Sequence, residues 1–228
     1  MNTLDTLMQQ RADLWRGGEL STTTHTVSTG FAALDEQLPG GGWPRGALTE
    51  ILLTRVGVGA LRLLMPALAA LSRQERWLNW VAPPYLPYAP ALAAAGVRLS
   101  RILLVHPDAR QDGLWAVEQS LRSGTCSAVL AWPVIDDTGT LRRLQLAAEA
   151  GDSAGFLFRP GHMAQRPSPA ALRLQLDSDA RGRLSVRILK RRGAHRTTPL
   201  LLDPDHVHPL ALHTPAATAA GGIQPQRH

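Results

Sequence analysis

A strand, glycine turn and helix pattern that could bind nucleotide phosphates runs from Leu48 to Leu64, with the sequence LTEILLTRVGVGALRLL. In such a segment, backbone N–H groups hold the phosphates, a lysine contacts the terminal phosphate oxygens and a Ser or Thr hydroxyl ligates magnesium. Here Ala60 and Leu61 follow Gly59, where the lysine and the hydroxyl would stand. The only lysine of the chain is Lys190, so no register supplies these groups. The pattern therefore predicts no phosphoryl transfer.

Positive charge is concentrated near the end of the chain. Seven of the 24 Lys and Arg residues lie between residues 181 and 196, and this segment contains no acidic residue. Such an excess suits an acidic partner such as nucleic acid, through contacts to the backbone that do not read sequence. The alternative is a solvated strand edge. The residues that we expect to bind DNA or a protein partner are Arg187, Lys190, Arg191, Arg192 and Arg196.

Four aromatic residues, Trp77, Trp80, Tyr85 and Tyr88, flank a proline-rich stretch, PPYLPYAP. Packing in the core and in the loop is the simplest role for them. An exposed set would instead anchor a protein partner, because aromatic side chains contribute much of the binding energy at interfaces. Base stacking on single-stranded DNA is a third alternative.

The elements that position these residues follow from the apolar pattern. Apolar strands alternate with amphipathic helices between residues 47 and 160. Residues 171–192 then form two alternating strands joined by a polar turn. This order predicts an α/β fold with a mostly parallel twisted sheet, helices on both faces and a C-terminal antiparallel hairpin.

Three parts of the chain are expected. Residues 1–20 form an N-terminal amphipathic helix and a linker, residues 26–208 the core, and residues 209–228 a flexible tail. One side of the helix is apolar and is expected to contact a partner. Its apolar residues are Leu4, Leu7, Met8 and Trp15.

A long motif, STGFAALDEQLPGGGWPRGALTEI at residues 28–51, resembles the opening of the RecA-type core. The matching positions are Thr29-Gly30, Leu34-Asp35, the glycine and proline run from Gly41 to Gly46, and Glu50-Ile51. Within that superfamily the chain is similar to the ImuA group. The stretches that carry this similarity are ALRLLMPAL, WLNWVAPPYLPYAPAL and RILKRRG.

The resemblance to ImuA implies a non-catalytic, RecA-like adaptor of SOS-induced, error-prone translesion DNA synthesis. The implied partners are ImuB, which resembles a Y-family polymerase, and an error-prone polymerase alpha subunit; RecA and single-stranded DNA are further candidates. RecA proteins carry a catalytic glutamate after the next strand and an aspartate at the end of the Walker B strand. The corresponding stretches, WVAPPY and SAVLAWP, contain neither acid. We therefore expect no enzymatic activity, no cofactor and no metal.

Two other functions fit the same features. One is a SulA-like inhibitor that binds the tubulin-like division protein and blocks septation, and the other is a regulator of RecA filaments. The chain has one cysteine and no apolar run of about 18 residues, the usual length of a membrane span. We therefore expect a cytoplasmic protein with no membrane partner.

Overall fold

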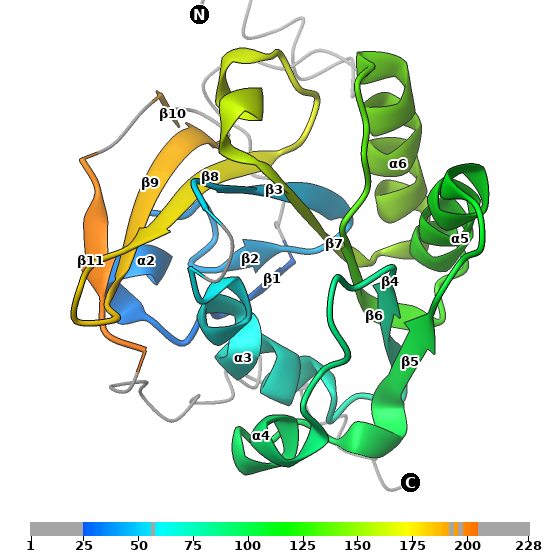
Figure 1. The fold of residues 1–228 in the computed structure, drawn as a ribbon, viewed down its shortest axis with the longest axis horizontal. Helices are drawn as coiled ribbons and strands as arrows, with labels where there is room; N and C mark the ends of the chain where they lie inside the picture. Colours follow the sequence, from blue (N-terminus) through cyan, green and yellow to red (C-terminus); the bar gives the residue numbers. More distant parts are fainter. Residues whose placement is uncertain (1–24, 56–57, 192–193, 196–197, 205–228) are drawn as a thin grey trace, which may run out of the picture.

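The computed structural model describes residues 25–55, 58–191, 194–195 and 198–204. The helix predicted within residues 1–20, the tail at 209–228, and the side chains of Arg192 and Arg196 lie outside the described residues. In the described part, one sheet of nine strands forms the centre of the molecule, and a two-stranded ribbon of β1 (Thr26–Val27) and β2 (Trp43–Pro44) lies beside it (Figure 1).

The middle of the large sheet consists of apolar strands that run parallel to one another. The order is β8, β3, β7, β6, β4 and β5. Their bounds are β3 (Ala47–Leu53), β4 (Trp77–Val81), β5 (Ile102–Val105), β6 (Cys126–Ala131), β7 (Ala154–Pro160) and β8 (Leu172–Ser178). Strands buried on both faces are expected to be nearly continuous apolar runs, as β6 is.

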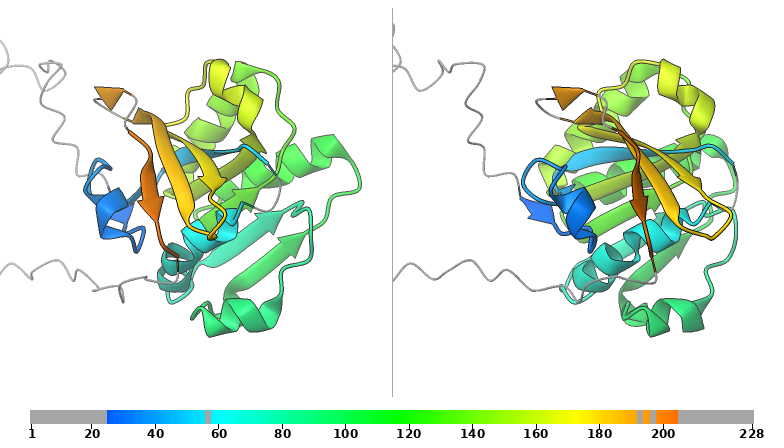
Figure 2. Two further views of the ribbon diagram at one scale, coloured as in Figure 1. Left: turned by 60° about the vertical axis from the view of Figure 1, so that its left-hand side comes forward. Right: turned by 90° about the vertical axis from the view of Figure 1, so that its left-hand side faces the viewer.

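The other end of the sheet is antiparallel. Strand β9 (Leu184–Arg191) pairs antiparallel with β8, with β10 (Ala194–His195) and with β11 (Leu200–Leu202). Figure 2 shows β8, β9 and β11 side by side, on the side of the molecule away from the longest helices. The sheet is therefore mixed and the helices are few. The prediction of a RecA-like, mostly parallel twisted sheet with helices on both faces and a C-terminal antiparallel hairpin is wrong. Beyond the hairpin of β8 and β9, strand β9 also pairs antiparallel with β10 and β11, so the sheet is mixed.

Two apolar clusters lie between the sheet and its helices. The larger contains side chains of α3 (Ala60–Leu71), α4 (Ala89–Ala94) and α2 (Ala32–Asp35), and the smaller contains those of α5 (Arg110–Arg122) and α6 (Thr138–Gly151). Short 3-10 helices, η1 (Leu99–Arg101) and η2 (Gly161–Gln165), complete the fold. None of the helices in the described residues is long and apolar enough to span a membrane.

A buried ion network holds three neighbouring strands together. Glu50 of β3 is fully buried and forms ion pairs with Arg159 of β7 and Arg173 of β8. The second pair joins Arg173 Nε to Glu50 Oε2 at 2.5 Å. The remaining guanidinium nitrogens of Arg173 donate to the backbone oxygens of Arg166 and Met163. Buried charges require this kind of pairing, so the network fixes how β7 and β8 lie against β3.

Candidate protein-interaction surface

The segment with the nucleotide-binding pattern is held by side chains from the far end of the chain. Strand β3 leads into residues 54–59 and then into α3, which begins after Gly59 in a left-handed conformation with φ of 80°. Arg55 Nε lies 3.2 Å from Asp177 Oδ1, and the Arg55 guanidinium also donates to the backbone oxygen of Ser178. Val56 and Gly57 lie outside the described residues. Arg55 is thus engaged in holding the end of β8.

The described residues of the predicted basic site do not act as one surface. Lys190 Nζ donates to the backbone oxygen of Ser168 at 2.8 Å, and the Arg191 guanidinium donates to the backbone oxygen of Gln37. Burial, and then the nearby charge of Arg173, lower the pKa of Lys190. Arg187 alone is exposed. The structure therefore gives Lys190 and Arg191 internal contacts and leaves Arg187 at the surface.

The aromatic residues divide between core and surface. Trp80 is fully buried and lies 6.2 Å from Trp132, measured between ring centroids. Trp77, Tyr85 and Tyr88 are exposed, Tyr88 to 73%. Packing explains Trp80, whereas the other three side chains remain available to a partner.

Further exposed apolar residues lie on the elements around these aromatics. They are Leu86 in the same loop, Leu99 in η1, Leu103 in β5 and Trp115 in α5. Together with Trp77, Tyr85 and Tyr88 we call them the edge surface, because they belong to elements at the β5 end of the sheet (Figure 1). Strand β5 pairs only with β4 among the described strands, so its outer backbone groups are not used in the sheet.

The exposure of Trp115 could be predicted from the sequence, whereas that of Leu103 could not. Trp115 follows Leu114 in α5 and falls outside the apolar stripe of Leu114, Val117 and Leu121, so helical spacing alone places it away from the core. Leu103 lies inside the apolar run ILLV, which suits a central strand. Only the sheet order, which puts β5 at the edge, explains why Leu103 is exposed.

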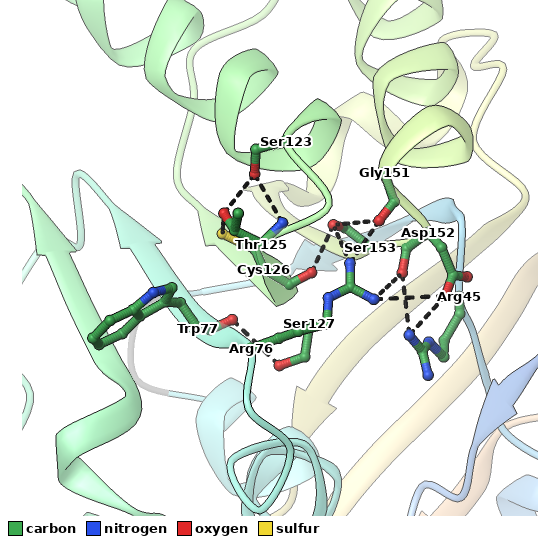
Figure 3. A network of polar contacts seen from close by, with 10 residues as sticks. All are labelled: Arg45, Arg76, Trp77, Ser123, Thr125, Cys126, Ser127, Gly151, Asp152 and Ser153. Atoms are coloured by element: carbon green, nitrogen blue, oxygen red, sulfur yellow. Dashed lines mark hydrogen bonds and ion pairs between the residues drawn. The ribbon is translucent and has the colours of Figure 1, made fainter.

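A polar network fixes the start of β4 and the backbone of Trp77 (Figure 3). The Trp77 backbone N–H donates to the oxygen of Thr125 at 2.9 Å, and Ser127 Oγ donates to the Trp77 oxygen at 3.2 Å. The Trp77 ring points away from this network in Figure 3. The Arg101 guanidinium carbon lies 6.0 Å from the ring centroid. The Trp77 ring is 40% exposed, and one side of it faces Arg101.

Two arginines complete this network at the end of α6. Arg76 donates to the backbone oxygens of Gly151 and Asp152, and Arg45 Nη2 lies 2.7 Å from Asp152 Oδ2. Cations are favourable at a helix C-terminus because its carbonyl oxygens carry partial negative charge. Burial, and then repulsion by Arg45, lower the pKa of Arg76. These groups therefore have structural partners within the protein.

The described residues show little that could hold a metal or a cofactor. Within the described ranges, no three His, Cys, Asp or Glu side chains lie together as a metal site would require. A cavity of about 310 Å³ lies at the carboxyl ends of β6 and β7. Arg159 and Asp137, which line this cavity, already bond to Glu50 and to the N–H of Thr140 at the start of α6. Arg159 and Asp137 thus serve structural contacts at this cavity.

Comparison with known proteins identifies the family. A family model described as "Cell division inhibitor SulA" matches residues 46–155. Cell division inhibitor SulA of Edwardsiella piscicida is 33% identical over 126 residues, which are 52% of this chain and 75% of that protein. SulA of Serratia proteamaculans is 30% identical over 139 residues, 60% of this chain and 82% of that protein. A crystal structure of SulA from Pseudomonas aeruginosa matches with 29% identity and a TM-score of 0.42, covering 50% of this chain and 98% of that one.

These matches correct several predictions. The assignment to the ImuA group is wrong, and with it the role in translesion synthesis and mutagenesis. The predicted partners ImuB, the polymerase alpha subunit, RecA and single-stranded DNA are wrong for the same reason. The matched proteins are named as division inhibitors and not as enzymes, which agrees with the prediction of a non-catalytic chain. The matches do not support the interpretation of residues 54–61 as a degenerate ATP site. The chain belongs to the SulA family of cell division inhibitors.

Proposed function

We propose that this chain inhibits cell division by binding the tubulin-like division protein in the cytoplasm, and that the edge surface makes the contact. The observation that carries the proposal is where the exposed apolar residues lie. Nine of the ten large exposed hydrophobic residues among those described fall within residues 46–155, the segment matched by the inhibitor family. Soluble proteins rarely expose large apolar patches unless these bind something.

The edge surface has the composition of a protein interface. It contains Trp77, Tyr85, Tyr88 and Trp115, and aromatic residues are enriched among those that dominate binding energy. Its residues lie on β4, β5, η1 and α5 and in the loop after β4. By binding the division protein, the chain would keep it out of its polymer, and no chemical reaction would be needed.

Cell morphology under overproduction tests the function. Cells that overproduce the wild-type chain should grow as filaments without septa. Purified chain should lower the amount of division protein that sediments as polymer. The double variant Tyr85→Ser/Tyr88→Ser should weaken binding at least tenfold, since loss of two buried aromatic contacts costs on the order of 2 kcal/mol or more.

The control is Val134→Ser, which changes a residue that is 58% exposed but lies outside the edge surface. It should leave filamentation and binding unchanged. Normal cell length despite accumulation of folded protein would overturn the proposed function. If filamentation persists in the tyrosine double variant, the proposed function would stand, but the edge surface would not be the contact.

A further inference from the structure

A second exposed face lies at the other end of the sheet, on β8, β9 and β11 (Figure 2). Side chains of β9 alternate along the strand. Leu184, Val186 and Ile188 are buried in the larger apolar cluster, and Arg187 between them is exposed. Register pairs Arg187 with Gln175, and Ser185 with both Asp177 and Leu201. Because paired residues point to the same side of a sheet, these five side chains share the outer face, which we call the basic face.

In the described part of the chain, Arg187 has no acidic partner of its own on this face, because the nearby acids are already paired. Asp179, in the turn before β9, accepts the backbone N–H groups of Arg181 and Arg183 and forms an ion pair with Arg183 at 2.8 Å. Asp177, which register places on this face, is already paired with Arg55. The Arg187 guanidinium has no hydrogen-bond or ion-pair partner among the described residues, and the sequence from 181 to 196 contains no acid. The face therefore attracts an acidic group from outside.

The neighbouring residues decide which acidic partner fits. Leu201 is 57% exposed on the same face, next to Ser185. A solvated leucine beside an arginine suits a partner that brings carboxylates and apolar side chains together. Single-stranded nucleic acid binds through aromatic stacking, but the exposed aromatic residues of the described chain belong to the edge surface, at the opposite end of the sheet.

We infer that the basic face binds an acidic protein segment with apolar side chains, whose carboxylate pairs with Arg187 and whose apolar group covers Leu201. Arginine favours this role because its planar guanidinium can hold a carboxylate through two hydrogen bonds. The face lies outside residues 46–155, the segment shared with the division inhibitors. The inference therefore stands independently of the proposed function and adds a second binding surface.

Fluorescence anisotropy with the full chain tests the inference. The probes are a short labelled peptide of alternating Glu and Leu, a polyglutamate peptide of equal length, and a labelled oligothymidine, each measured over a salt series. The Glu–Leu peptide should bind most tightly, and its affinity should fall as salt rises. Arg187→Glu should weaken this binding about tenfold, because it replaces a charge-assisted contact by a repulsion.

Two further variants define the site. Arg142→Glu makes the same charge change at an exposed position on α6 and should leave peptide affinity unchanged. Leu201→Gln should weaken the Glu–Leu peptide several-fold and leave polyglutamate unaffected. Equal weakening by Arg187→Glu and Arg142→Glu would overturn the site, because it would reduce the effect to net charge. Failure of the peptide to bind at low salt, or an oligothymidine affinity that exceeds the peptide's and is lost in Arg187→Glu, would overturn the inferred partner.

Discussion

At the scale of single residues, Glu50 is a charged side chain that depends on its neighbours to stay buried. Its carboxylate is fully buried and is shared by Arg159 and Arg173, which come from two different strands. Removing one partner of a buried ion pair is costly because the remaining charge stays in a medium that solvates it poorly. The free-energy cost of removing the Glu50 charge is larger here, because it leaves two buried guanidinium groups without their carboxylate.

Glu50→Gln should therefore lower the free energy of unfolding by about 3–5 kcal/mol. Urea denaturation followed by circular dichroism measures the change. The matched control is Asp136→Asn, which breaks an ion pair with Arg110 whose two side chains are more than half exposed. That change should cost less than about 1 kcal/mol, as surface pairs do. Similar losses for the two variants would contradict the structural role of the buried network.

Cys126 allows a test of burial at one atom. It is a buried free cysteine, and burial raises the pKa of its thiol, against hydrogen bonds from Thr125 and Ser123 that lower it. The native thiol should therefore react with iodoacetamide far more slowly than the same thiol in urea, because the thiolate is the reactive form. Equal rates in the native and unfolded states would show that the thiol is not buried.

The same thiol gives a pH dependence of stability with a definite sign. A raised pKa means that the folded state keeps the proton while the unfolded state releases it. The contribution is fully present below the ordinary thiol pKa and is lost as the pH rises above it. The free energy of unfolding of the wild type should thus decrease at alkaline pH more than that of Cys126→Ala. Parallel curves for the two proteins would exclude this contribution.

At the scale of elements, α6 depends on a close approach to α5. A Cβ atom on Gly151 would collide with the backbone oxygen of Leu121. Gly151→Ala should therefore destabilise the protein by about 1–3 kcal/mol, the usual cost of overpacking, although alanine is the better helix former. Thermal denaturation measures this change.

The control on the same helix is Gly139→Ala, where the nearest obstacle is the Asp137 side chain at 3.2 Å. This carboxylate is the cap of α6 and accepts the Thr140 N–H at 2.6 Å, but it can move slightly. The loss at Gly139 should be smaller than the loss at Gly151. The opposite order would mean that the contact with α5 relaxes easily.

The positions of many strands and helices could be predicted from the sequence, but the order of the strands in the sheet could not. The runs ALTEILL and AGFLFRP coincide with β3 and β7, because strands that are buried on both faces are mostly apolar. The order of the sheet depends on pairings between distant residues, such as Glu50 with Arg173, which no local pattern contains. The exposed state of Leu103 and the internal bonds of Lys190 and Arg191 depend on that order. The predicted binding sites in residues 1–20 stay untested predictions.

At the scale of the whole molecule, the segment shared with the inhibitors is not a separate unit. Residues beyond it supply much of the larger cluster. On the C-terminal side they begin with Phe156 and Phe158, and those after residue 160 are Leu172, Leu174, Leu176, Leu184, Val186, Ile188 and Leu202. Burying each such side chain contributes about 1.5–3 kcal/mol, so losing the set after residue 160 would cost about as much as, or more than, the typical net stability of about 5–15 kcal/mol.

Truncation tests this dependence. A chain ending at residue 160 should fail to fold, whereas one ending at residue 204, which keeps every described element, should fold. Circular dichroism and size-exclusion chromatography distinguish the two. A monomeric fragment 1–160 with cooperative unfolding would show that β8, β9 and β11 are dispensable.

The position of β3 in the sheet also affects how the chain folds during its synthesis. Strand β3 lies between β7 and β8, and about 120 residues separate it from β8 along the chain. A ribosome adds about 5–20 residues per second, so this apolar strand leaves the ribosome on the order of 10 s before its last neighbour is made. During that interval it is open to chaperones and to other nascent chains. The yield of this protein in a cell is therefore set by the pace of its synthesis as well as by the stability of its finished fold.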